Sequence, residues 1–373
     1  MTNIPSIYKS KRIVIKIGSS LLIKDNYFNY PWLETFIDDL LILKKKKIEI
    51  IVVASGAVSL GKNYLKLGDK KLKINEKQAC AACGQVILME NFMKAFDKKK
   101  IKVAQLLMTF SDTEDRRKSL NSRETINSLI DSNVIPIINE NDTVATDELK
   151  FGDNDRLASR VAQIFGAQNL ILLSDVDGLY EKNPKFFKNS KFIDLVYDIN
   201  KNLKSMATSD TNLYGSGGML TKLQAAEMAS SFGCNTLVCS GKIKNPISNY
   251  LKKKRGTWFL SKNKQKTGFK SWLAGTIKVS GSLYIDHGAC NALVKGASLL
   301  PSGVKKISGK FSRGDIIEII TSSGKKIGKG ISFYDSLEIN KIKGKKTSEI
   351  KKILGYLGRD EIIHRDNLTL NEK

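Results

Sequence analysis

Histidine is almost missing from this chain of 373 residues, which contains only His287 and His364. Both lie in the last quarter of the sequence, so the long first part has no histidine to act as a general base or as a metal ligand. Chemistry there has to use carboxylates, hydroxyls, amides and lysines. Transfer of a chemical group to an acceptor that is already an anion needs no general base. A carboxylate with a pKa of about 4.3 is such an acceptor.

Cysteine is also scarce, with five residues scattered along the chain. That number and spacing do not form a disulfide framework, and they fit a reducing compartment. Cys80 and Cys83 have the spacing of a redox motif, but residues 76–96 around them are rich in alanine and methionine and have helical periodicity. We interpret the pair as small residues in a helix interface, with a thiol switch as the alternative.

Long apolar runs are absent as well. No stretch of 18 apolar residues occurs, and residues 1–12 lack the apolar centre of a signal peptide. The sequence therefore predicts a soluble, cytoplasmic protein without a membrane span. With 41% hydrophobic residues, the chain can bury a large core, and it is long enough for two domains.

Acidic residues are outnumbered by basic ones, 37 against 62, which gives a net charge of +25. Only 10 of the basic residues are arginine, and residues 274–373 carry 18 basic and 10 acidic residues, so the excess is mostly lysine spread along the chain. Such a spread is typical of solvated faces and not of a focused nucleic-acid stripe. We therefore expect no nucleic-acid partner, only a general attraction for anionic ligands.

The first 260 residues alternate between strand and helix patterns. Apolar, β-branched runs predict strands at residues 12–17, 48–54, 101–108, 134–138, 169–173 and 236–239, and helical periodicity occurs at residues 31–47, 75–98, 157–165 and 222–231. This alternation predicts an α/β fold, a three-layer sandwich with a mostly parallel sheet covered on both faces. A polar, lysine-rich linker is predicted at residues 261–273. Short strands with frequent glycines then predict a small β-barrel-like domain at residues 274–373.

The stretch from residue 137 to residue 155 leaves an apolar strand and breaks into amides and carboxylates. Ligands of parallel sheets lie beyond the carboxyl ends of the strands, and short polar side chains at such an end are poor candidates for a core. The composition fits a binding loop, and it fits an ordinary solvated turn equally well. The neighbouring motifs have to decide between the two.

Two glycine-containing turns each carry a lysine. Residues 215–222 (Gly-Ser-Gly-Gly-Met-Leu-Thr-Lys) open a predicted helix, and Lys16 with Gly18 and Ser19 ends the first strand. Backbone N–H groups of such turns converge on an oxyanion, and lysines stabilise the charge of a transferring phosphoryl group. For residues 215–222, a flexible surface loop is the alternative. No Gly-x-x-x-x-Gly-Lys-Ser/Thr motif occurs, which excludes a P-loop enzyme.

Five motifs, in this order, resemble those of the amino acid kinase superfamily, and most closely those of its glutamate-phosphorylating members. They are Lys-Ile-Gly-Ser-Ser at 16–20, Ser-Gly-Ala at 55–57, Asn-Glu-Asn-Asp at 139–142, Gly-Asp-Asn-Asp at 152–155 and Gly-Gly-Met-Leu-Thr-Lys at 217–222. The part after the linker is similar to a PUA domain, through Asp-His-Gly-Ala at 286–289, Leu-Leu-Pro-Ser-Gly at 299–303 and Phe-Ser-Arg-Gly-Asp at 311–315. The resemblance covers nearly the whole chain.

The resemblance implies ATP-dependent phosphorylation of the γ-carboxylate of L-glutamate, the first step of proline biosynthesis. The residues that it assigns to catalysis are Lys16, Lys222 and Asp155, and those that it assigns to glutamate binding are Ser55, Asp142 and Asn154. The implied ATP-binding positions are Lys16, Ser174, Asp175, Ser216, Gly217, Gly218, Met219, Leu220, Thr221 and Lys222. Mg²⁺ is expected on the nucleotide phosphates, without a protein ligand that we can name.

The same resemblance implies that Asp155 holds the two lysines in position, that the protein is a homo-oligomer and that proline is a feedback inhibitor. Ser174 stands where we associate a threonine, and Leu220 is bulkier than the serine expected in the glycine loop. Two alternatives stay open. One is another member of the superfamily, acetylglutamate or aspartate kinase, and the other is an RNA-binding role of the PUA-like part. Asp142 favours a substrate with a free ammonium group, which N-acetylglutamate lacks.

Overall fold

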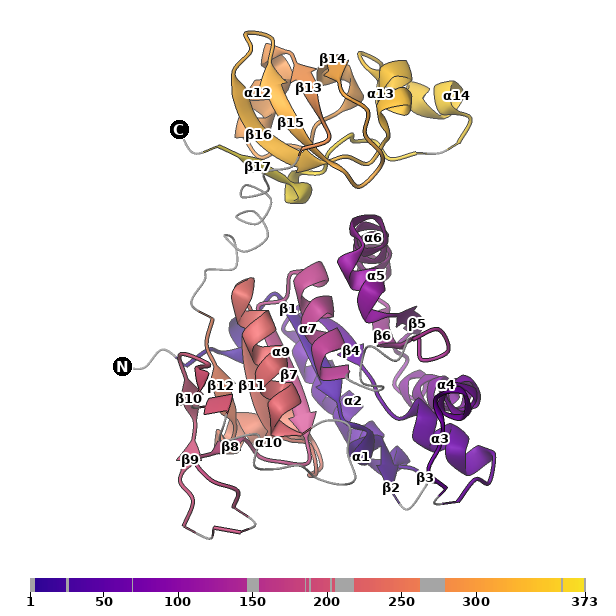
Figure 1. The fold of residues 1–373 in the computed structure, drawn as a ribbon, viewed down its shortest axis with the longest axis vertical. Helices are drawn as coiled ribbons and strands as arrows, with labels where there is room; N and C mark the ends of the chain where they lie inside the picture. Colours follow the sequence, from indigo (N-terminus) through magenta and orange to yellow (C-terminus); the bar gives the residue numbers. More distant parts are fainter. Residues whose placement is uncertain are drawn as a thin grey trace. The chain divides into compact units, whose positions relative to one another are not determined.

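The structure is a computed structural model that describes residues 4–24, 27–68, 70–145, 154–184, 186–187, 189–201, 203–204, 218–261, 279–356 and 358–371. The chain forms two compact units (Figure 1). The first comprises Met1–Asp115 and Asn121–Gln265, and the second comprises Arg116–Leu120 and Lys266–Lys373. The predicted linker at residues 261–273 lies outside the described residues except for Ser261. Within the described ranges, no helix is long and apolar enough to cross a membrane.

An eight-stranded sheet forms the centre of the first unit. Its strands are β1 (Arg12–Ile17), β4 (Glu49–Val53), β5 (Val103–Met108), β6 (Ile135–Glu140), β7 (Asn169–Ser174), β10 (Leu195–Val196), β11 (Asn235–Ser240) and β12 (Thr257–Phe259). They are ordered β10-β12-β11-β7-β1-β4-β6-β5, and every neighbouring pair is parallel except β11 and β12. The mostly parallel sheet predicted from the sequence is therefore confirmed.

Helices cover both faces of this sheet. One hydrophobic cluster joins it to α2 (Tyr30–Lys45), α3 (Ala57–Tyr64), α4 (Ile74–Asp97) and α10 (Pro246–Lys253). A second cluster joins it to α6 (Arg116–Asp131), α7 (Asn154–Phe165) and α9 (Met219–Ser231). Ile13 and Ile15 belong to the first cluster and Val14 to the second, because successive side chains of a strand point to opposite faces. The three layers are confirmed.

Three element boundaries differ from the prediction in a way that matters for function. β6 continues to Glu140 and not only to residue 138, because its pairing with β5 extends to Met108. α7 begins at Asn154 and α9 at Met219, each three residues before the predicted start. The first turns of these helices are polar or glycine-flanked, so the apolar periodicity does not reveal them. The shorter elements are α1 (Ser19–Leu22), β2 (Ile23–Lys24), β3 (Tyr27–Phe28), α5 (Phe110–Glu114), β8 (Leu179–Tyr180) and β9 (Phe192–Ile193).

The second unit is built on a five-stranded mixed sheet. Its strands are β13 (Gly281–Ile285), β14 (Val304–Ser308), β15 (Ile316–Thr321), β16 (Lys326–Ile331) and β17 (Leu368–Leu370), in the order β14-β13-β15-β16-β17. β13 and β15 are parallel, and the other neighbours are antiparallel. The helices are α12 (His287–Val294), α13 (Ser336–Ile342) and α14 (Ile350–Leu354). Of residues 274–279 at the start of the predicted domain, only Val279 is described, and the first described strand begins at Gly281.

Helices α3 and α4 approach each other at two glycines. A Cβ on Gly84 would lie 1.8 Å from the carbonyl oxygen of Ala57, and a Cβ on Gly61 would lie 1.7 Å from that of Cys80. Cys80 is buried at this contact, and burial raises the pKa of its thiol. A thiol with a raised pKa is a poor nucleophile. These observations favour helix packing over a thiol switch for the Cys-Ala-Ala-Cys motif.

Replacing Gly84 by alanine is expected to lower the free energy of unfolding by about 1–3 kcal/mol, because the added methyl group has no room between the two backbones. Urea unfolding followed by circular dichroism measures the change. Gly288→Ala on α12 is the matched control, since a Cβ there approaches only Asp286 Oδ1, at 3.4 Å. Equal stability of the Gly84→Ala variant and the native protein would refute the tight helix contact.

Candidate active site

Four polar strand ends lie at one edge of the parallel sheet. In the register of the sheet, Lys16 of β1 pairs with Val53 of β4 and with Leu172 of β7, and Val53 pairs with Ile138 of β6. Parallel strands end at the same edge, which is where α/β proteins bind ligands. Lys16, Ser55, Asp142 and Ser174 therefore converge on that edge, within or just after β1, β4, β6 and β7.

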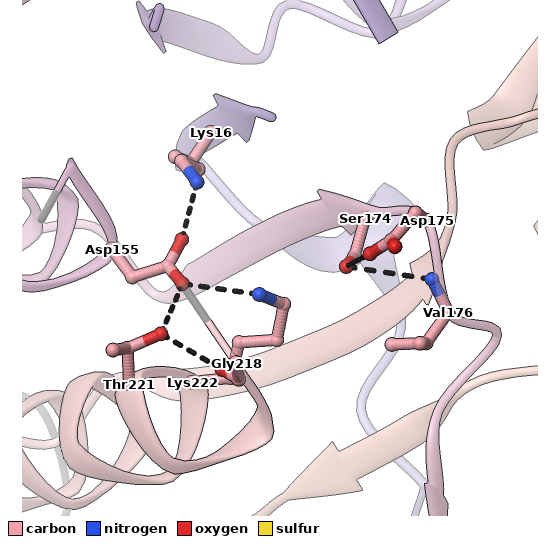
Figure 2. Close-up of polar contacts among 8 residues, drawn as sticks. All are labelled: Lys16, Asp155, Ser174, Asp175, Val176, Gly218, Thr221 and Lys222. Carbon is pink, nitrogen blue, oxygen red and sulfur yellow. Dashed lines mark hydrogen bonds and ion pairs between the residues drawn. The ribbon is translucent and has the colours of Figure 1, made fainter. Parts of the chain in front are cut away.

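Asp155 bridges two lysines that come from distant parts of the chain. It lies in the first turn of α7 and is 2% exposed. Its Oδ1 is 2.6 Å from Lys16 Nζ of β1, and its Oδ2 is 3.2 Å from Lys222 Nζ of α9 (Figure 2). Burial by itself raises the pKa of Asp155, but the charges of the two lysines outweigh it and hold this pKa well below its usual range. The structure thus brings together the three residues predicted to be catalytic.

The first turn of α9 is attached to the same carboxylate. Thr221 Oγ1 is 3.0 Å from Asp155 Oδ2 and 2.8 Å from the carbonyl oxygen of Gly218, so its hydroxyl can donate to either (Figure 2). Deeper in the contact, Ser159 of α7 donates to the carbonyl oxygen of Ala225 in α9. The packing of α7 against α9 therefore sets the distance between Asp155 and Lys222.

The three residues predicted to bind glutamate share an unusual property. Ser55, Asp142 and Asn154 are all buried, and each has a buried side-chain oxygen with no hydrogen-bond partner among the described residues. Native proteins pair nearly all of their buried polar atoms. A polar ligand that donates to Asp142 Oδ1 and Asn154 Oδ1 would satisfy two of these atoms. Their role in glutamate binding stays a prediction.

Asp142 has the opposite electrostatics to Asp155. Burial raises the pKa of Asp142 to about 7, and the negative charge of Glu140 adds to this effect. Asp142 and Glu140 line a cavity of about 310 Å³, together with Gln85 of α4. A ligand cation beside Asp142 would favour its ionised form. Gln85 lies outside every sequence motif, and only its spacing of seven residues from Gln78, on the same helix face, could have indicated it.

The predicted nucleotide positions are described in part. Ser174 Oγ donates to Asp175 Oδ1 over 3.1 Å and lies 3.5 Å from the backbone nitrogen of Val176 (Figure 2). Asp175 itself is exposed. The side chains of Met219 and Leu220 pack against the cluster of α7 and α9. Ser216 and Gly217 lie outside the described residues. Among those that are described, no group of three His, Cys, Asp or Glu residues could hold a metal ion.

Comparison with known proteins agrees with this geometry. Residues 11–240 match the profile of the amino acid kinase family, and residues 281–354 match that of the PUA domain. A glutamate 5-kinase of Rhizobium rhizogenes is 43% identical over 371 residues, which are 99% of this chain and 95% of that protein. A glutamate 5-kinase of Pelagibacter ubique is 45% identical over 361 residues, or 96% of this chain and 98% of that protein.

The chain therefore belongs to the amino acid kinase family and carries a PUA domain after the kinase part. Within this family it belongs with the glutamate 5-kinases, since such relatives align with it over almost their entire length. The resemblance seen in the sequence motifs is confirmed.

The raised pKa of Asp142 predicts how stability depends on pH. An aspartate in the unfolded chain has a pKa of about 3.9, so between about pH 4 and pH 7 the folded protein binds more protons than the unfolded one. The stability of the ligand-free protein should fall as pH rises through this window, and Asp142→Asn should flatten the fall and raise Tm at pH 8. Calorimetry of both proteins across this range measures it, and parallel curves would contradict the assignment.

Proposed function

We propose that this chain transfers the γ-phosphoryl group of ATP to the γ-carboxylate of L-glutamate and so forms L-glutamyl 5-phosphate. The observation that supports this most directly is the pairing of two features at one sheet edge. One is the cluster of Lys16, Asp155 and Lys222, and the other is the set of buried oxygens without partners among the described residues. The first suits a phosphoryl group, and the second suits an amino acid.

The residues predicted to bind glutamate divide between the two charged groups on its α-carbon. Asp142 and Asn154 present acceptor oxygens, which suit the ammonium group of the substrate. Ser55 presents a hydroxyl two residues before α3, and the first N–H groups of a helix have no partner within it, which suits the α-carboxylate. The γ-carboxylate is ionised at neutral pH and attacks without a base, in agreement with a kinase part that contains no histidine.

The lysines act on the group that is transferred. Lys16 and Lys222 approach Asp155 from different elements, and two ammonium groups around one carboxylate leave a surplus positive charge. That charge stabilises the oxygens of the transferring phosphoryl group and of the leaving ADP. Asp155 stays ionised and positions both lysines. Ser174, Asp175 and residues 216–222 would hold ATP, and Mg²⁺ would be bound mainly by the nucleotide phosphates and water.

Family membership supports two further expectations about regulation and assembly. We expect inhibition by proline, the end product of the pathway, and we expect a homo-oligomer. Addition of proline to an assay of ADP formation from glutamate and ATP tests the inhibition. Light scattering tests the homo-oligomer.

The substrate assignment predicts hydroxamate formation from free L-glutamate, ATP, Mg²⁺ and hydroxylamine, which traps an acyl phosphate. Aspartate, N-acetylglutamate, carbamate and UMP should give less than about one hundredth of this turnover, because each lacks either the ammonium group or the chain length that the site selects. A coupled ADP assay measures the same series independently. Turnover of N-acetylglutamate without turnover of glutamate would disprove the proposal.

The role of Lys222 predicts a kinetic asymmetry. Lys222→Ala is expected to lower kcat by about a hundredfold or more and to change the glutamate KM by less than about threefold, because the charge that it meets develops during transfer. Lys253→Ala, at the end of α10, is a control at an exposed lysine and should leave both constants unchanged. An unaltered kcat of the Lys222→Ala enzyme would remove this residue from the transition state.

A further inference from the structure

Helix α4 contacts the segment of residues 139–145 at both ends, and Asp142 lies between these two contacts. We propose that Gln85 and Gln78 of α4 are positioning residues that hold segment 139–145 so that Asp142 meets the ammonium group of the substrate. This inference rests on the proposed function as a glutamate kinase.

The first contact fixes the start of the segment. Asn139 is 2% exposed, and its Oδ1 accepts a hydrogen bond of 2.9 Å from the backbone nitrogen of Glu140. Its Nδ2 then has to donate elsewhere, and it donates to Gln85 Oε1 over 2.8 Å. Because Asn139 is buried, loss of this acceptor would strand a buried donor, which proteins rarely tolerate. Gln85 is therefore tied to the orientation of the residue that precedes Glu140.

The second contact fixes the end of the segment. Gln78 Nε2 donates to the carbonyl oxygen of Ala145 over 3.2 Å. Gln78 and Gln85 are seven residues apart, so they lie about two turns apart on one face of α4. Between the two contacts the segment is bonded to β5 through the Asn141 nitrogen, which donates to the Met108 carbonyl oxygen. The segment also has internal hydrogen bonds, such as that from Thr143 to Asn141.

The position of α4 is itself set by α3, the helix that follows Ser55. Gly84, next to Gln85, meets the backbone of Ala57 at the start of α3, and α3 follows directly after Ser55 and Gly56. Gly56 has φ of +113°, a value that glycine adopts without strain. One helix therefore supports the segments of Ser55 and Asp142, two of the three residues of the proposed glutamate site. The bonds that hold Lys16, Asp155 and Lys222 come from β1, α7 and α9 instead.

Substitutions of the two glutamines on α4 should therefore affect glutamate binding and leave ATP binding and phosphoryl transfer nearly unchanged. Gln85→Met keeps the length of the side chain and removes the acceptor oxygen. It should raise the glutamate KM about tenfold and change the ATP KM and kcat by less than twofold. Asn91→Leu is the matched control on the same helix, because the Asn91 amide donates to the carbonyl oxygen of Ile87 within α4 itself. It should leave all three constants unchanged.

Gln78→Met is the second variant, and it decides the question if Gln85→Met does not fold. It should raise the glutamate KM severalfold with an unchanged ATP KM. Wild-type constants in both variants would overturn the inference, and so would an equal rise of both KM values, which would indicate a general packing role. Absence of glutamate turnover by the native enzyme would instead count against the proposed function.

Discussion

The ion-pair cluster around Asp155 is the constraint on which the rest of the kinase part depends. A carboxylate that is 2% exposed is costly to bury, and it is tolerated here because two ammonium groups surround it. These groups come from β1 and α9, while Asp155 comes from α7. The cluster therefore forms only when the centre of the sheet, α7 and α9 are in place. The two lysines therefore reach this arrangement only when the kinase part is folded.

Two buried aspartates at the same sheet edge illustrate how surroundings divide chemical roles. Asp155 finds its counter-charges within the chain, which lowers its pKa, whereas the pKa of Asp142 is raised by burial and by Glu140. A carboxylate that is paired internally positions other groups. A carboxylate whose Oδ1 has no partner among the described residues has binding capacity left for a cation. The distinction follows from burial and charge, since the two side chains are identical.

The part of the sheet edge that carries Ser55 and Asp142 depends on packing more than on charge. The close approach of α3 and α4 at Gly84 needs a residue without a side chain, and it places Gln85 against the segment that carries Asp142. A small residue in a helix interface thus contributes to the geometry of a polar site. The same helix contact includes the backbone of Cys80, the first residue of the Cys-Ala-Ala-Cys motif.

The sequence by itself determined the alternation of strands and helices, the mostly parallel sheet and the polar motifs at the strand ends, because hydrophobic period and turn chemistry are local properties. Family motifs also singled out Lys16, Asp155 and Lys222. Only the tertiary structure decided that one carboxylate lies within 2.6 Å and 3.2 Å of the two lysines, and that Gln85 bonds Asn139. It also decided the starts of α7 and α9. Such contacts join residues far apart in the chain, and their distances follow from how the layers pack, which no local pattern encodes.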